Sequence, residues 1–199
     1  KPGGGYALMD PTNENTRDIF PSYLSDKSYL VCRPGGERLM TTDVLPSAVN
    51  SVCVESSGKV SADGSMVLEN SIAFGGVNDT IYRGALARRT PDEREDLFGR
   101  IVAKFAPGAE LLSCDIEPKD IRDTEKPLKV KLFTRIPEAR LNGRERIELI
   151  LPMISKTLGY ANFLLEGSTS LDRRKYPLSL DTTAQTVEKP QRYRRAAAL

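Results

Sequence analysis

The chain has 199 residues, of which 39% are hydrophobic and 28% are charged, a composition that suits one good-sized globular domain or a domain with an appendage. It contains no apolar run long enough to span a bilayer, and it does not open with a signal segment. The formal charge of +2 includes Arg192, Arg194 and Arg195, without which 26 basic groups stand against 27 acidic ones. The body therefore lacks the basic excess of a nucleic-acid-binding surface.

The first 45 residues combine short apolar stretches with turns. Tyr6–Met9 is predicted to be a short strand that runs into Asp10, and the stretch "DPTNENTRD" that begins there is typical of a turn. A second strand is expected at Tyr29–Cys32, and Leu39–Pro46 is expected to be extended. The composition then changes, and we place a domain boundary near Thr41–Ser47, between residues 45 and 46.

A hairpin and a helix are predicted next. Apolar residues alternate from Val49 to Phe74 on both sides of Asp63-Gly64, which is a strong signal for a β-hairpin. Val77–Ala87 follows with the spacing of a helix. Its apolar face consists of Ile81, Tyr82, Ala85 and Leu86.

A second helix has clear start and stop signals. Thr90 is a good N-cap, Pro91 fits the first helical position, and Glu93 completes a capping box. Pro107-Gly108 ends the pattern. Between these points an apolar stripe, expected to be buried against a sheet, is formed by Leu97, Phe98, Ile101, Val102 and Phe105.

Strand patterns return in the last part of the chain. The candidates are Glu110–Glu117, Leu128–Ile136, Arg146–Leu151 and Tyr176–Thr183, whereas the segment between residues 151 and 165 is ambiguous. Runs of strands before and after a helical pair predict an α+β fold with a largely antiparallel sheet. We interpret residues 46–188 as a β-sandwich-like domain with the helical pair inserted, and residues 189–199 as a tail.

Cysteine, histidine and acidic residues give little sign of a site. The sequence contains no histidine, and Cys32, Cys53 and Cys114 are widely spaced, so the usual zinc-ligand sets are nearly excluded. Each cysteine lies in an apolar stretch, which favours a small buried side chain, although a disulfide between two of them stays open. Four acidic residues between positions 115 and 123 lack the spacing of a calcium loop and are interpreted as a solvated loop.

The order of these features resembles the C-terminal part of bacterial transglutaminase-like proteins. Those proteins carry a papain-like core between modules of unknown function (the DUF3857/DUF3858 type), and the resemblance extends to about Val187. Its most specific element is the Asp-Pro-Thr that follows a short apolar stretch, "YALMDPTNENT". "DKSYLVCRPGGERL", the Asp-Gly hairpin, "TPDEREDLFGRIVAKFAPGAEL" and "RRKYPLSL" complete the succession.

The resemblance implies a role for Asp10. In that family a Cys-His-Asp triad performs catalysis, and its aspartate stands in such an Asp-Pro-Thr stretch, which implies that Asp10 is the triad acid and that the Cys and the His lie upstream. This sequence departs from the active pattern because it has no histidine, so the chain by itself has no activity by that route. From the residues alone, the favoured interpretation of Asp10 is a turn residue whose carboxylate accepts from backbone N–H groups.

The resemblance also implies the biological setting. Residues 1–45 would be the C-terminal edge of the core, and residues 46–188 an accessory domain that packs on or positions the core of the same protein at the periplasm or cell surface, with neither cofactor nor metal. The alternatives are a freestanding envelope module that binds peptide, glycan or protein, and an enzyme with an unrecognised carboxylate site. The chain does not begin with Met, so we expect a piece of a longer protein, with Ala196–Leu199 derived from a vector.

Overall fold

A computed structural model defines the fold. It describes residues 8–32, 34–35, 39–106, 108–142, 147–149, 153–162, 173, 175–176 and 180–195. For residues 140–142, 147–149 and 190–195 it describes the backbone alone.

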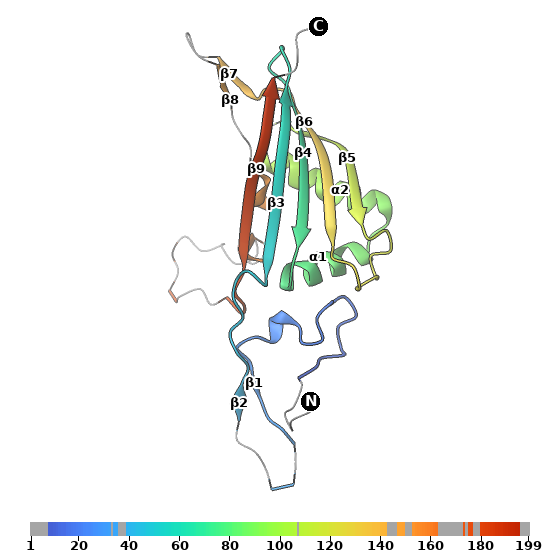
Figure 1. The fold of residues 1–199 in the computed structure, drawn as a ribbon, viewed down its shortest axis with the longest axis vertical. Coiled ribbons are helices and arrows are strands. Elements are labelled where there is room, and N and C mark those ends of the chain that lie inside the picture. The colour runs from blue at the N-terminus through green and yellow to red at the C-terminus, as the bar shows by residue number, and fades with distance from the viewer. Residues whose placement is uncertain are drawn as a thin grey trace.

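The largest element is a five-stranded sheet with helices on one face. Its strands lie in the order β5-β6-β4-β3-β9, and all neighbours are antiparallel except the parallel pair β3 and β9 (Figure 1). The bounds are β3 (Ser51–Val60), β4 (Met66–Phe74), β5 (Glu110–Glu117), β6 (Lys129–Ile136) and β9 (Gln185–Arg195).

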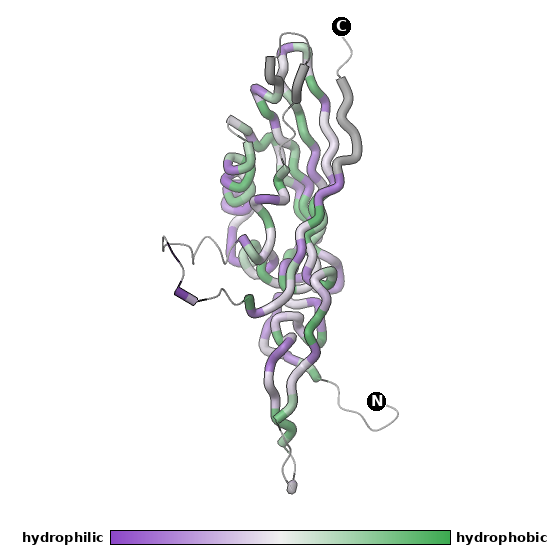
Figure 2. The backbone as a smooth tube through the Cα atoms, turned by 90° about the vertical axis from the view of Figure 1, so that its left-hand side faces the viewer, coloured by the Kyte–Doolittle hydropathy of each residue, from purple (hydrophilic) through white to green (hydrophobic). Residues whose placement is uncertain are grey.

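Two helices connect β4 to β5 and form the second layer of the domain. They are α1 (Val77–Ala87) and α2 (Pro91–Phe105), and both lie on the same side of the sheet (Figure 2). The predicted α+β class and the inserted helical pair are therefore confirmed. The layer that packs on the sheet is helical, however, and not the second sheet that a β-sandwich would have.

The remaining elements are short, and one of them, the 3-10 helix η2 (Ile154–Thr157), contributes the fully buried Ile154 to the core of the two-layer body. The N-terminal part contains the 3-10 helix η1 (Ser22–Leu24) and the short pair β1 (Ser28–Tyr29) and β2 (Met40–Thr41). The C-terminal part contains the short pair β7 (Arg140–Asn142) and β8 (Ile147–Leu149), followed by η2.

Alternation of side chains decides which face of the sheet is covered. Val52 and Val54 on β3 are buried under the helices, whereas Cys53 and Glu55 between them are exposed on the open face. The same period of two runs along β4 and β6. One face of the sheet therefore forms the core with the helices, and the other faces solvent.

Helix α1 begins at a glycine that no other residue can replace without strain. Gly76 has φ 54°, and a Cβ at this position would lie 2.2 Å from Asn50 Oδ1. That oxygen accepts the backbone N–H of Val77 at 2.9 Å and so satisfies one of the unpaired donors at the helix start. Asn50 also donates to the carbonyl of Thr183 at 2.8 Å, so one buried amide joins the start of α1 to the segment before β9.

Helix α2 has the predicted capping box and buries its middle turns. The Thr90 hydroxyl accepts from the backbone N–H of Glu93, whose carboxylate accepts from that of Thr90. Phe98 and Val102 are fully buried, whereas Leu97 and Phe105 are half-buried at the rim of the core. The prediction of a buried stripe is right for its centre and wrong for Leu97 and Phe105, which pack against the core but are only partly buried.

Replacing Phe98 by alanine is expected to lower the free energy of unfolding by about 3–5 kcal/mol, the range for a fully buried aromatic side chain. Leu97→Ala on the same helix is the matched control and should cost clearly less, because Leu97 is half-buried. Urea denaturation of the three proteins measures the difference. Equal losses for the two variants would contradict the assignment of Phe98 to the centre of the core.

The strand predictions are right where local signals are strong. β5 has the predicted bounds, and β6 and the Asp63-Gly64 hairpin lie as expected. Leu8 and Met9 are not in a strand, and the remainder of the Tyr6–Met9 prediction lies outside the described residues. At Tyr29–Cys32 only Tyr29 is in a strand. None of the described residues of the predicted strand Tyr176–Thr183 belongs to one.

Strand β9 was missed because it contains a proline and many charges. Residues 189–195, assigned to a tail by sequence, form the second half of this strand beside β3. Pro190 lies opposite Ser56, and the register of the pair shifts between Ser56 and Ser57. Proline is tolerated at an edge strand and at a bulge, and β9 offers both, so the strand continues past it.

Candidate functional site

The N-terminal segment, residues 8–45, packs against one end of the two-layer body (Figure 1). The Arg17 guanidinium donates to the carbonyl oxygens of Thr124 at 3.1 Å and Glu125 at 3.4 Å, in the connection between β5 and β6. The hydroxyl of Thr183 donates to the carbonyl of Leu45 at 2.6 Å, just before β9. The segment is thus fixed to the body at two separate points.

Asp10 lies in this segment with both carboxylate oxygens hydrogen-bonded. Oδ1 accepts from the backbone N–H of Thr12 at 2.9 Å and from its hydroxyl at 2.5 Å. Oδ2 accepts from the hydroxyl of Tyr23 at 2.9 Å, and the Asp10 N–H donates to the carbonyl of Ile19 at 3.1 Å. The expected turn bond to Thr12 is present. Tyr23, which belongs to η1, was not anticipated.

These donors hold Asp10 in its ionised form. The Thr12 hydroxyl, the Thr12 N–H and the Tyr23 hydroxyl, in this order of effect, lower the pKa of Asp10 below its usual value. Desolvation and the bond to Asp10 raise the pKa of Tyr23, so the phenol keeps its proton and remains a donor. No ion pair of Asp10 is found among the described residues, and the arrangement is an oriented, half-buried carboxylate.

Exposed apolar residues occur next to Asp10 and at other positions of the same segment. Met9 precedes Asp10 in the chain and is 66% exposed. Ile19, whose carbonyl accepts the backbone N–H of Asp10, is 71% exposed. Of the twelve exposed large apolar side chains that the structure describes, six lie in residues 8–45: Leu8, Met9, Ile19, Leu30, Leu39 and Val44. The segment therefore carries a large share of the exposed apolar side chains for its length, and such side chains are candidates for a contact surface.

A second candidate is a depression of about 430 Å³ on the open face of the sheet. It is lined mainly by Cys53, Glu55, Ser71, Asp115, Lys129 and Lys131. Lys131 lies 3.4 Å from Glu69, and Asp115 forms an ion pair with Lys119 that lowers the pKa of Asp115. The lowered pKa keeps Asp115 ionised, so this carboxylate is not a proton donor for general acid catalysis.

The three cysteines differ in exposure. All three are free thiols, and Cys32 and Cys53 are exposed, which contradicts the expected burial: Cys53 lies on the uncovered face of β3. Burial, followed by the charges of Glu95 and Asp115, raises the pKa of Cys114 to about 12. A buried thiol of this kind is inert as a nucleophile.

In the part of the chain that the structure describes, no three Cys, Asp or Glu side chains come close enough together to hold a metal ion. Within the same residues, none of the helices has the length and apolar character needed to cross a membrane. Comparison of the whole chain with protein-family models, with curated proteins and with solved structures finds no match.

Proposed function

We propose that this chain is a non-catalytic accessory module of a transglutaminase-like cysteine protease or amidase of the cell envelope. Residues 1–45 complete the papain-like core and supply Asp10 as the triad acid, and the two-layer body packs on that core and positions it. The observation that carries the proposal is the oriented Asp10 carboxylate, presented among exposed apolar side chains on a segment that is fixed to the body.

The chemistry of a triad explains why such a carboxylate is useful. A carboxylate that accepts from one imidazole nitrogen fixes the tautomer of the histidine and stabilises the imidazolium that forms during acyl transfer. Asp10 meets the requirement because its own hydrogen bonds hold it still and keep it ionised. The exposed apolar groups beside it supply the contact with the core that brings the histidine into place.

The alternative, a freestanding envelope module that binds peptide, glycan or protein, would place its contact surface on the two-layer body. Of the twelve exposed large apolar side chains that the structure describes, six are spread over the much longer stretch that begins at residue 46: Val49, Val67, Leu112, Met153, Tyr176 and Leu180. The other six lie within residues 8–45. Two of the charged side chains that line the depression on the open face are already paired, Lys131 with Glu69 and Asp115 with Lys119. The distribution therefore favours the accessory role.

Sequencing the gene upstream of the Lys1 codon tests the proposal directly. We expect the reading frame to encode a cysteine and, some tens of residues later, a histidine, both before the Asp-Pro-Thr stretch. An upstream frame that encodes neither residue would refute the assignment of Asp10 to a triad and would favour the freestanding module.

The isolated chain is expected to show no thiol-dependent amidase or acyl-transfer activity. A thiolate needs an activating base, the sequence contains no histidine, and Cys114 stays protonated. The measurement is hydroxamate formation from a glutaminyl peptide, with and without prior alkylation by iodoacetamide. Turnover that alkylation of Cys32, Cys53 and Cys114 abolishes would contradict the assignment.

A further inference from the structure

The hydrogen bonds of Asp10 leave the carboxylate with few free acceptor positions. An ionised carboxylate has two oxygens with about four lone-pair sites in total. Oδ1 already accepts from the N–H and the hydroxyl of Thr12, and Oδ2 already accepts from Tyr23. A further donor is therefore confined to the remaining direction on Oδ2.

Tyr23 reaches Asp10 through its hydroxyl. The phenol donates to Asp10 Oδ2 at 2.9 Å. Desolvation, followed by this bond to Asp10, raises the pKa of Tyr23, so the phenol keeps the proton that it donates. Tyr23 therefore acts on Asp10 as a hydrogen-bond donor.

The helical turn that carries Tyr23 is anchored independently. The Ser25 hydroxyl donates to the carbonyl of Asp43 at 2.9 Å and accepts the backbone N–H of Leu45 at 2.8 Å, immediately after η1. The position of the phenol therefore depends on contacts made by its own turn and does not require Asp10.

We infer that Tyr23 is a positioning residue for Asp10: by occupying one acceptor direction of Oδ2, it leaves a single direction open to an incoming N–H donor such as a histidine imidazole. The inference rests on the proposed function, because the donor belongs to the core. It goes further in naming the oxygen that receives the donor and the residue that selects it.

The first arm of the test uses this chain alone. The pKa of Asp10 is measured from the ¹³C shift of its side-chain carboxyl group in the wild-type chain and in Tyr23→Phe. Loss of the hydrogen bond from the Tyr23 hydroxyl should raise the pKa of Asp10. Thr12→Val is the positive control and should also raise it, because the Thr12 hydroxyl makes the largest contribution. Tyr29→Phe is the matched negative control, since the Tyr29 hydroxyl contacts Met40 Sδ at 3.9 Å and not Asp10.

The second arm measures kinetics in the full-length protein. Tyr23→Phe should lower kcat by about ten- to a hundredfold, the range that corresponds to one hydrogen bond to a charged group, with little change in KM. Tyr29→Phe should leave both constants unchanged. A merely structural role of Tyr23 would instead reduce the fraction of folded enzyme, which active-site titration of the thiol separates from a fall in kcat.

The outcomes of the two proposals are distinguishable. If Asp10→Asn retains wild-type activity in the full-length protein, the proposed function fails. If Asp10→Asn loses activity while Tyr23→Phe keeps the wild-type kcat, the triad assignment stands and the positioning role of Tyr23 is overturned. An Asp10 pKa that does not change in Tyr23→Phe overturns the role as well, whatever the kinetics.

Discussion

Exchange of Asp10 for asparagine in the proposed full-length enzyme is expected to lower kcat by about four orders of magnitude, the loss seen when a triad aspartate becomes an amide. An amide carries no charge to stabilise the imidazolium, and it favours the wrong tautomer of the histidine. The fold should remain intact, because Asn can still accept from Thr12 through its side-chain oxygen and can donate to the Tyr23 oxygen.

Asp63→Asn is a matched control for this experiment. Asp63 Oδ1 accepts the backbone N–H of Ser65 at 2.9 Å and its hydroxyl at 2.7 Å, which reproduces the bonds between Asp10 and Thr12. Asp63 lies in the turn between β3 and β4, where the resemblance assigns no catalytic role. Circular dichroism should show both variants folded, and only Asp10→Asn should lose activity. Equal activities would mean that Asp10 is a turn residue like Asp63.

The parts of the fold that sequence predicts well are those determined by neighbours in the chain. The cap formed by Thr90, Pro91 and Glu93 defines the start of α2 because each of its bonds spans at most three residues. The Asp63-Gly64 turn fixes its hairpin for the same reason. Strand β9 instead depends on β3, more than a hundred residues away, and its local composition gives no sign of that partner.

The same distinction applies to the candidate site: contacts between near neighbours in the chain can be predicted from sequence, and contacts between distant residues cannot. The bond from Thr12 to Asp10 is a two-residue turn that the sequence Asp-Pro-Thr predicts. Tyr23 reaches Asp10 across thirteen residues of irregular chain, and no periodic pattern links the two. A sequence signal was available for Asp79 and Arg83, which are four residues apart in a predicted helix, but such pairs usually lie on the surface.

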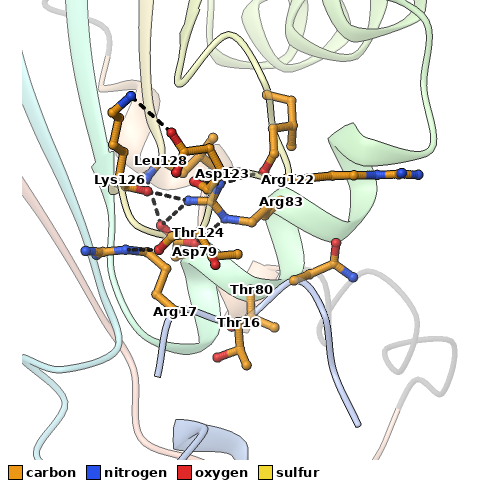
Figure 3. A network of polar contacts seen from close by, with 12 residues as sticks. Thr16, Arg17, Asp79, Thr80, Arg83, Arg122, Asp123, Thr124, Lys126 and Leu128 are labelled. Carbon is orange, nitrogen blue, oxygen red and sulfur yellow. Dashed lines mark hydrogen bonds and ion pairs between the residues drawn. The ribbon is translucent and has the colours of Figure 1, made fainter. Parts of the chain in front are cut away.

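Replacing Arg83 by methionine is expected to lower the free energy of unfolding by about 3–5 kcal/mol, the loss that follows when one member of a buried ion pair is removed. Arg83 is fully buried, and its Nε lies 2.8 Å from Asp79 Oδ1 (Figure 3). Methionine would leave the Asp79 carboxylate buried with the backbone N–H of Leu128, at 2.8 Å, as its remaining donor among the bonds described.

The guanidinium also organises the connection between β5 and β6. Its two Nη atoms donate to three carbonyl oxygens of that connection, at 2.6 Å to Ile121, 3.1 Å to Asp123 and 2.9 Å to Lys126. Removing Arg83 should therefore speed amide hydrogen exchange across residues 119–127 beyond what global destabilisation explains. Arg17 from the N-terminal segment binds the carbonyls of Thr124 and Glu125 in the same connection.

Two further variants separate the ion pair from general effects of removing an arginine. Arg88→Met is the control: Arg88 lies near the end of α1, donates to the carbonyl of Gly84 at 3.0 Å and is exposed, so its loss should stay within about 0.5 kcal/mol. Arg83→Met combined with Asp79→Leu should be less destabilising than Arg83→Met alone, because no charge is then left buried.

A loss below about 1 kcal/mol for Arg83→Met in urea denaturation would show that water or a shifted side chain satisfies Asp79. The connection would then be held by its own turns. The link from the body to the Asp10 segment would depend on Arg17 and on the contacts that residues 181–183 make with Ser22, Lys27 and Leu45.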